Sequence, residues 1–358
     1  MAETWLLVGT AKGLFRFRSR DRLHWQAFGP EFPQTPCYTA VFDMRSGVLF
    51  AGVNSEFYGA SVRRSRDLGE TWDGGGEGLQ YDAADEEKVT RVWAIAPGRA
   101  DEPDTVYAGV EASGLFRSLD GGETWSEVRA LRQHPTHELW VPGYGGKCLH
   151  TVALSGASTL YTACSAGGIY RSGDAGESFA PINAGLEARF LPEGSRFPEA
   201  GQCVHKFDVS PSRPDRIWLQ NHGGVYRSDD GGTSWIEVGR SLPGDFGFPI
   251  LAHPEDPDTA YIIPLRADAE RWADGGTLGV WRTRDAGATW QPMTEGLPAP
   301  SYASVLRDAL GHDGGDPLGL YFGTTSGSVF ASPDGGEHWH EVAGHLPRIF
   351  SVRAAMVP

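Results

Sequence analysis

The chain has 358 residues, a hydrophobic fraction of 40% and a formal net charge of −15 at pH 7. This excess of acidic residues disfavours a general nucleic-acid-binding or anionic-membrane-binding surface. No apolar stretch approaches the ~20 residues needed to span a bilayer. Residues 1–10 lack the basic region and cleavage site of a signal peptide and are expected to form a strand. Four cysteines and the absence of an N-x-S/T sequon predict a reducing, cytoplasmic location.

A short motif recurs along the whole chain and determines the expected architecture. Its well-formed copies are SRDLGETW from Ser65, SLDGGETW from Ser118, SGDAGESF from Ser172, SDDGGTSW from Ser228, TRDAGATW from Thr283 and SPDGGEHW from Ser332. A shorter copy, SRDRLHW from Ser19, lacks the glycine. The motif aspartates, which lie 46 to 56 residues apart, are Asp21, Asp67, Asp120, Asp174, Asp230, Asp285 and Asp334. A period of this length indicates a repeat architecture.

The residues of the motif suit a tight turn. An aspartate can accept hydrogen bonds from backbone N–H groups that follow it, and glycine adopts positive φ without steric cost. The sequence D-x-G therefore closes a hairpin, and the following Trp opens the next strand and packs between neighbouring repeats. We expect a structural role for all seven aspartates.

The segments around each motif predict four strands per repeat, here named A to D. Strands B and C, separated by a glycine-bearing loop, are expected in ranges such as 105–118, 159–172, 216–228 and 319–332. The A strands are expected in ranges such as 89–97, 148–156, 203–211 and 248–254. Four strands in each of seven repeats predict an all-β fold, a seven-bladed β-propeller.

The two ends of the chain support one closed ring. Residues 5–10 resemble a B strand with no A strand before them, and residues 349–358 resemble an A strand with nothing after them. We expect the C-terminal strand to pair with the N-terminal blade, which hides strand edges that an open ring would expose. The chain is therefore predicted to be a single domain over residues 1–358.

The motif S-x-D-x-G-x-T-W resembles the Asp-box, or BNR repeat. This repeat occurs in sialidases, sortilin-type receptors, xyloglucan-degrading hydrolases and the photosystem II assembly factor, and the resemblance covers essentially the whole chain. It implies the propeller fold but not one activity, because those families share the repeat and differ in chemistry. The Arg-Ile-Pro type motif of sialidases is missing, so sialidase activity is not expected.

Function is expected on the face opposite the motifs. In propellers of this kind the A–B and C–D turns share one face, and the D–A and B–C loops share the other. The second face carries the longest loops, at 126–147, 180–202 and 264–277. Binding residues concentrate in long loops on a rigid scaffold.

An arginine and two histidines are predicted at the mouth of the central channel. When the A strands are aligned on their closing residues, Arg91, His150, His205 and Phe248 fall at the same level. These positions open the innermost strands, where apolar residues would pack equally well. We therefore weigh a functional role for the basic residues.

Each of the two histidines has a cysteine two positions earlier. In KCLH and QCVH, Cys148 lies beside His150 and Cys203 beside His205, because residues i and i+2 of a strand face the same way. His222, in a loop of the same repeat as His205, is expected to reach the same mouth. Imidazoles and thiolates are the usual ligands of zinc and related transition metals.

Three interpretations of the mouth remain open. In the first, His150, His205 and His222 bind zinc or another divalent transition metal, and the two cysteines either join them or only pack. In the second, the mouth binds a small anion without a metal. In the third, the residues only stabilise the fold. The first two assign acid–base catalysis to His150 and His205, and substrate binding to Arg91, Lys206, Asn221 and Arg348.

The functions predicted from these residues fall into different classes. The first is a cytoplasmic enzyme of hydrolase or lyase type acting on a small anionic substrate, with metal assistance as one variant. The alternatives are a scaffold that binds a protein partner, and a glycoside hydrolase using two carboxylates. Candidate carboxylates on the loop-rich face are Glu56, Glu111, Glu138, Asp245, Asp268 and Glu270. The oligomeric state is not determined by the sequence.

Overall fold

The protein is built from short antiparallel strands and very little helix. The computed structural model describes residues 2–74, 76–143 and 145–357. The helical turns lie on connecting loops and are α1 (Arg129–Arg132), η1 (Pro135–Leu139), η2 (Glu193–Ser195) and η3 (Asp274–Gly276). Among the described residues, no helix is long and apolar enough to cross a membrane.

Within these ranges the strands pair as seven antiparallel units of four. From the innermost to the outermost strand, the units are β28 (Ile349–Val357), β1 (Glu3–Thr10), β2 (Gly13–Ser19) and β3 (Gln26–Glu31); β4 (Cys37–Asp43), β5 (Val48–Ser55), β6 (Gly59–Ser65) and β7 (Asp73–Gly74); β8 (Arg91–Pro97), β9 (Val106–Glu111), β10 (Leu115–Ser118) and β11 (Ser126–Glu127); β12 (Cys148–Ser155), β13 (Thr159–Ser165), β14 (Gly168–Ser172) and β15 (Ala180–Pro181); β16 (Val204–Val209), β17 (Ile217–Asn221), β18 (Gly224–Ser228) and β19 (Ile236–Glu237); β20 (Phe246–Ala252), β21 (Ala260–Leu265), β22 (Val280–Thr283) and β23 (Gln291–Met293); β24 (Val305–His312), β25 (Leu320–Thr324), β26 (Val329–Ser332) and β27 (His340–Ala343).

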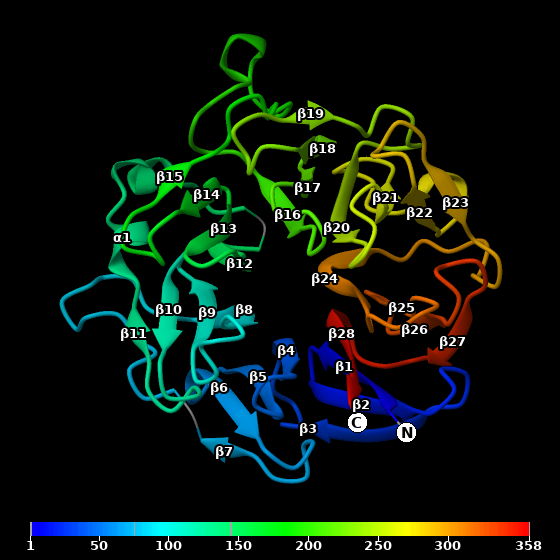
Figure 1. Cartoon of the computed structure of the whole chain (residues 1–358), viewed down its shortest axis with the longest axis horizontal. Coiled ribbons are helices and arrows are strands. Elements are labelled where there is room, and N and C mark those ends of the chain that lie inside the picture. The colour runs from blue at the N-terminus through cyan, green and yellow to red at the C-terminus, as the bar shows by residue number, and fades with distance from the viewer. Residues whose placement is uncertain (1, 75, 144, 358) are drawn as a thin grey trace.

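The units are arranged in a ring whose two chain ends lie together (Figure 1). Strand β28 pairs with β1 from Glu3 opposite Val357 to Thr10 opposite Ile349, so one unit contains both termini. Single bridges connect two pairs of neighbouring units, Asp308 with Ser351 and Cys148 with Glu111. The innermost strands therefore surround the centre of the ring, and the short fourth strands lie at its rim.

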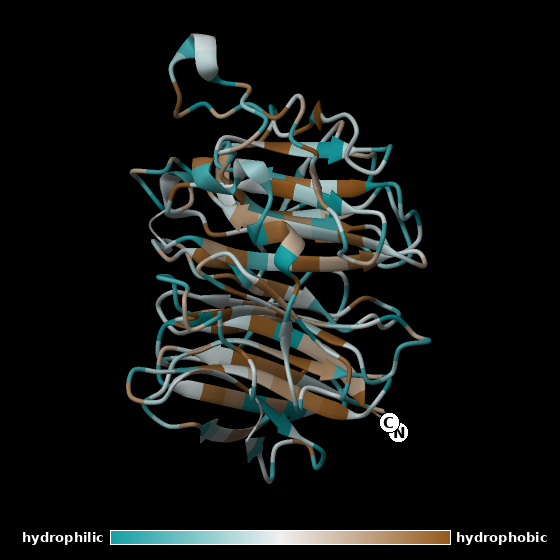
Figure 2. Ribbon diagram, turned by 90° about the vertical axis from the view of Figure 1, so that its left-hand side faces the viewer, coloured by the Kyte–Doolittle hydropathy of each residue, from teal (hydrophilic) through white to brown (hydrophobic). Residues whose placement is uncertain are grey.

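The apolar core lies between neighbouring units. One cluster joins Phe50 and Val62 of the β4–β7 unit to Val92 and Phe116 of the next unit. Figure 2 shows hydrophobic residues along the strands and hydrophilic residues on many of the connecting loops. The motif tryptophans add polar contacts between units, because Trp290 Nε1 donates to the Val238 carbonyl of the preceding unit at 2.8 Å. Each unit thus covers an apolar face of its neighbour.

The repeated motif closes the turn after the third strand of each unit. In the copy at Asp120, the carboxylate accepts hydrogen bonds from Ser118 Oγ at 2.7 Å and from the Thr124 backbone N–H at 2.9 Å. Thr124 Oγ1 donates to the second carboxylate oxygen at 2.6 Å. The aspartates of the other copies accept equivalent bonds, with His24 and His338 replacing the hydroxyl residue beside Asp21 and Asp334. All seven carboxylates are engaged within their own turns.

Candidate functional site

The innermost strands share an irregularity near the end where each begins. In β4, β8, β12 and β16 the pairing register shifts by one residue, and in β28 it shifts beside Gly9 and Thr10. The residues left without an opposite partner are Tyr38, Trp93, His150, His205 and Phe350. Related but longer irregularities include Phe248 in β20 and Arg307 in β24. A β-bulge redirects a side chain, so each unit presents a different residue at this level.

Most of these residues line one pocket of about 340 Å³. Its described lining consists of Tyr38, Trp93, Gly145, His150, Phe248, Arg271, Leu306, Arg307, Asp308, Arg348 and Phe350. Six of the seven innermost strands contribute residues in or directly before them. The pocket therefore forms where the units meet, although its residues are far apart in the sequence.

One wall of the pocket is aromatic. Tyr38 and Phe350 stack with ring centroids 4.2 Å apart and planes 10° apart. Trp93 packs edge-on against Tyr38 at 4.7 Å. The Arg307 guanidinium lies 5.5 Å from the Trp93 ring centroid. The wall offers flat apolar surfaces to a ligand beside a fixed positive charge.

The charged residues of the pocket are mainly basic. Arg307 Nη1 lies 3.5 Å from Cys148 Sγ, and neither Arg307 nor Arg348 has a carboxylate partner among the described residues. Asp308 is the one carboxylate in the described lining, and it is ion-paired with both Lys206 and Arg353. Burial opposes ionisation of Asp308, but these two cations lower its pKa. The pocket therefore retains uncompensated positive charge.

Arg91 does not occupy the position predicted by the alignment. The pairing register places Trp93, two residues later, at the level of His150. The alignment failed because Pro97 still pairs with Val106 inside the sheet, whereas its supposed equivalent in the β16 unit lies beyond the strand. Arg91 instead pairs with Glu111 at 2.6 Å.

Two other residues predicted to bind substrate have internal partners. Lys206 is buried and pairs with Asp308, so it reaches the pocket only through that carboxylate. Asn221 is fully buried and donates to the Glu187 carbonyl at 3.2 Å and to Gln202 Oε1 at 3.1 Å. Of the predicted substrate-binding residues, Arg348 is the one that lines the pocket among the described residues.

His150 lines the pocket but has both ring nitrogens in hydrogen bonds. Its Nε2 lies 3.0 Å from the Val204 carbonyl, which can only accept, so Nε2 carries the hydrogen. Nδ1 then accepts from Thr151 Oγ1 at 2.9 Å. Burial and the nearby Arg307 lower the pKa of His150 well below its usual value, so the ring is neutral at neutral pH. His150 thereby links two neighbouring units.

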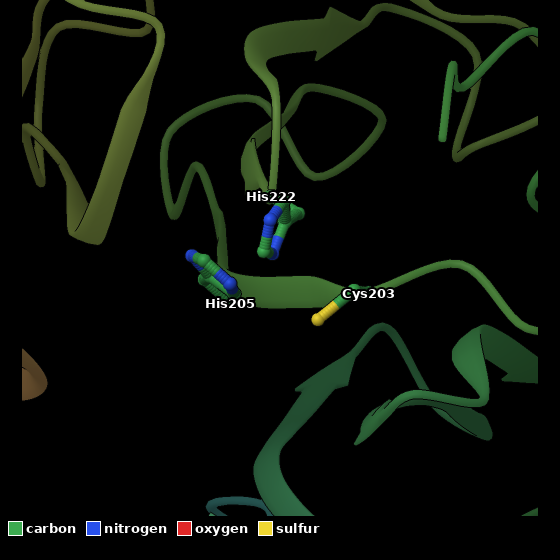
Figure 3. A group of neighbouring side chains, drawn as sticks. All are labelled: Cys203, His205 and His222. Carbon is green, nitrogen blue, oxygen red and sulfur yellow. The ribbon is translucent and has the colours of Figure 1, made fainter. Parts of the chain in front are cut away.

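The other two histidines converge with a cysteine (Figure 3). One potential ligand atom from each of Cys203, His205 and His222 lies within 4.8 Å of the other two, whereas His150 is outside this described group. The two imidazole centroids are 5.3 Å apart. Burial lowers the pKa of both histidines and raises the pKa of the Cys203 thiol to about 11. Sequence reasoning thus identified two histidines of this group and the neighbouring cysteine.

The carboxylates proposed for glycoside hydrolysis are largely held by arginines. Glu111 pairs with Arg91, Asp245 with Arg189, Asp268 with Arg271 and Glu270 with Arg266, at 2.5 to 2.8 Å. Glu56 lines a separate groove that includes the exposed Phe57 and Tyr58. None of the six candidates belongs to the described lining of the central pocket.

Several pocket residues were not predicted from the sequence. Arg307 follows Val305 in the β24 strand, which was not included in the alignment of the repeats. Aligning that strand and β4 would have placed Arg307 and Tyr38 near the mouth. Arg271 comes from the long 264–277 loop, for which the repeats offer no equivalent position. It lies 5.6 Å from the Phe248 centroid.

Comparison with known proteins supports the fold assignment. A xyloglucanase from Paenibacillus sp. is 26% identical over 244 residues, which cover 57% of this chain and 22% of that protein. An ancestral GH74 enzyme superposes with a TM-score of 0.60 at 17% identity, covering 86% of this chain and 38% of the other. YCF48 bound to D1 peptide gives a TM-score of 0.52 at 16% identity, covering 82% and 78%. No family model matches the chain.

The fold is that of the Asp-box β-propeller superfamily. This confirms the resemblance inferred from the repeated motif. The chain spans about a fifth of the length of the Paenibacillus xyloglucanase it matches, 22%. The identities to solved structures, 16% and 17%, establish shared architecture rather than shared chemistry.

Proposed function

We propose that this Asp-box propeller is a hydrolase that binds a small anionic ligand in its central pocket. In this proposal the seven strand units are the blades of one closed domain, residues 1–358. The observation that carries it is the presence of Arg271, Arg307 and Arg348 in the pocket, two of them without a carboxylate partner among the described residues. Arginine is well suited to bind carboxylate or phosphate through two parallel hydrogen bonds.

The pocket walls suggest which anions fit best. A volume of about 340 Å³ lies in the range of small-molecule sites. The stacked Tyr38 and Phe350 rings and the edge of Trp93 offer apolar faces for the ring of a sugar or a similar cyclic compound. We therefore propose a sugar acid, a sugar phosphate or a compound of similar shape and charge.

We assign proton transfer to His222 rather than to His150. Both nitrogens of His150 are hydrogen-bonded within the protein, whereas His222 is partly exposed, with its Nε2 3.5 Å from Asp268 Oδ2. Asp268 also pairs with Arg271 of the pocket. A neutral imidazole beside a carboxylate can accept a proton from water in a hydrolytic reaction.

Hydrolysis of a neutral polysaccharide is the second candidate, because the Paenibacillus relative is a xyloglucanase. Glycoside hydrolysis requires two carboxyl groups about 5–9.5 Å apart, one of them often acting as an acid. The described lining of the pocket offers Asp308, whose pKa is lowered by Arg353 and Lys206 against the effect of burial. The anionic ligand is therefore favoured.

Thermal shift and calorimetric titration with glucuronate, glucose 6-phosphate and uncharged glucose test this proposal. We expect the two anions to bind and glucose to bind at least tenfold more weakly. The Arg307→Gln variant should lose about tenfold or more in anion affinity, since a hydrogen bond to a charged group contributes ~1.5–3 kcal/mol. Arg284→Gln removes the same charge from an exposed motif turn and should bind like the wild type.

Two outcomes would overturn the proposal. One is equal affinity for glucose and the anions. The other is cleavage of xyloglucan oligosaccharides by the wild type and by Arg307→Gln at the same rate, which would favour the polysaccharide hydrolase.

A further inference from the structure

The backbone brings Cys203, His205 and His222 together from two adjacent strands. Cys203 directly precedes β16, and His205 is the bulged residue two positions later. His222 directly follows β17, and its backbone N–H donates to the Cys203 carbonyl at 2.9 Å. The group is therefore fixed by sheet pairing rather than by a flexible loop alone. Potential ligand atoms of the three side chains lie within 4.8 Å of one another.

The hydrogen bonds of the histidines suit metal ligation. His205 Nδ1 lies 2.5 Å from the Gly247 carbonyl and must donate to it, so Nε2 of the neutral ring keeps a free lone pair. His222 Nε2 lies 3.5 Å from Asp268 Oδ2. Metal-binding histidines usually bond through the second ring nitrogen to a backbone carbonyl or a carboxylate, which fixes the ring orientation. Both types of partner are present here.

The packing around the group is apolar. Phe246 packs edge-on against both imidazoles, with centroids 5.1 Å from His205 and 5.2 Å from His222. Phe190 lies 5.2 Å from the His222 centroid. Within the described structure, no hydrogen bond joins Cys203 Sγ to either imidazole. Three polar ligand atoms thus face one another without satisfying one another, inside an apolar shell.

We propose that Cys203, His205 and His222 bind a divalent transition metal, with Asp268 orienting His222. One sulfur and two imidazole nitrogens favour zinc over magnesium or calcium, which prefer oxygen ligands. The bland alternative, that the three residues only fill space, does not account for the convergence of three ligand atoms.

The metal site adjoins the central pocket but does not depend on the anion proposal. Phe248 lines the pocket and stacks on His205 with centroids 4.9 Å apart. Asp268 pairs with Arg271, which also lines the pocket. Zinc bound here would lie beside the anion-binding residues, where it could supply a Lewis acid.

Titration of metal-free protein with Zn²⁺ and Co²⁺ tests the inference without any substrate. We expect one ion per chain and, with Co²⁺, a thiolate-to-metal absorption band. Cys203→Ser should abolish that band, and His222→Ala should weaken affinity at least tenfold. Asp268→Asn should weaken it by about 10–100-fold, the usual effect of losing a partner that orients a ligand.

Two controls separate this result from other effects. His338→Thr removes an exposed imidazole from a motif turn and should leave metal binding unchanged. Arg307→Gln should retain the metal while losing anion affinity, so the two proposals can fail independently. Absence of stoichiometric binding by the wild type, or an unchanged Co²⁺ spectrum in folded Cys203→Ser, would overturn the metal site.

Discussion

The two faces of the ring use the same repeats in opposite ways. On the motif face, all seven turns place an aspartate in nearly the same set of short hydrogen bonds. At the mouth, the bulged positions hold residues as different as Tyr38, Trp93, His150 and His205. Repetition therefore marks what stabilises each unit, and departure from repetition marks the candidate site.

The largest effect on stability is expected beneath the mouth. Lys206→Met leaves the buried Asp308 with Arg353 as its remaining cation. Breaking a buried ion pair by removing one partner typically costs ~3–5 kcal/mol, and the second cation places this case near the lower end. Urea unfolding of the variant should show a loss of about 3 kcal/mol.

A matched exposed pair sharpens this comparison. Arg240 pairs with Glu237 at 2.9 Å while its side chain remains 83% exposed. Arg240→Met should cost less than ~1 kcal/mol, as exposed pairs usually do. Equal losses in the two variants would show that Lys206 and Asp308 do not form a distinct buried pair.

A smaller effect is expected on the motif face, and it depends on pH. Burial raises the pKa of Asp120, but hydrogen bonds from Thr124 and Ser118 outweigh it and lower the value from 3.8 to about 2. A lowered pKa stabilises the fold fully above 3.8, and this contribution is lost as the pH falls through about 2. Asp120→Asn should cost about 1 kcal/mol at pH 7.

The pH profile of urea unfolding checks this prediction. Asp120→Asn should lose less stability than the wild type between pH 4 and pH 2, because its side chain does not titrate. Asp101→Asn removes a carboxylate from an exposed turn and should follow the wild type. Parallel profiles for Asp120→Asn and the wild type would contradict the role of the motif carboxylate.

The smallest effect comes from the residue after the motif aspartate. This position is left-handed at both Ala286, φ 60°, and Gly121, φ 70°. Ala286→Gly should stabilise the protein by about 0.5 kcal/mol, because relief of the left-handed strain, ~1–2 kcal/mol, exceeds the entropic cost of glycine. Gly121→Ala, whose added methyl group would meet open space, should destabilise it by a similar amount. Thermal unfolding of the reciprocal pair measures both, and effects of equal sign would contradict this account.

The repeats made the fold predictable, because their chemistry is local. Ser118, Asp120, Gly122 and Thr124 interact within one turn, so their spacing alone indicates the structure. The pairing of the C-terminal strand with the first unit also followed from counting strands. No knowledge of distant contacts was needed for either inference.

The site was predictable only where it followed the strand pattern. The i, i+2 spacing placed Cys203 beside His205, and the repeat placed His222 nearby. The pattern could not show that bulges shift the register, which moved Arg91 out of the mouth level and brought in Trp93. Nor could it show the partners of His150 and Lys206, because hydrogen bonds across units depend on how the units pack.

The central claim is that the mouth, and not the motif face, binds anions. Anomalous diffraction from crystals soaked in tungstate tests it directly, because this anion scatters strongly and needs no knowledge of the substrate. The account predicts a tungstate peak between Arg307 and Arg348 that disappears in the Arg307→Gln/Arg348→Gln variant. Ordered tungstate only on the motif face, or an unchanged peak in that variant, would contradict it.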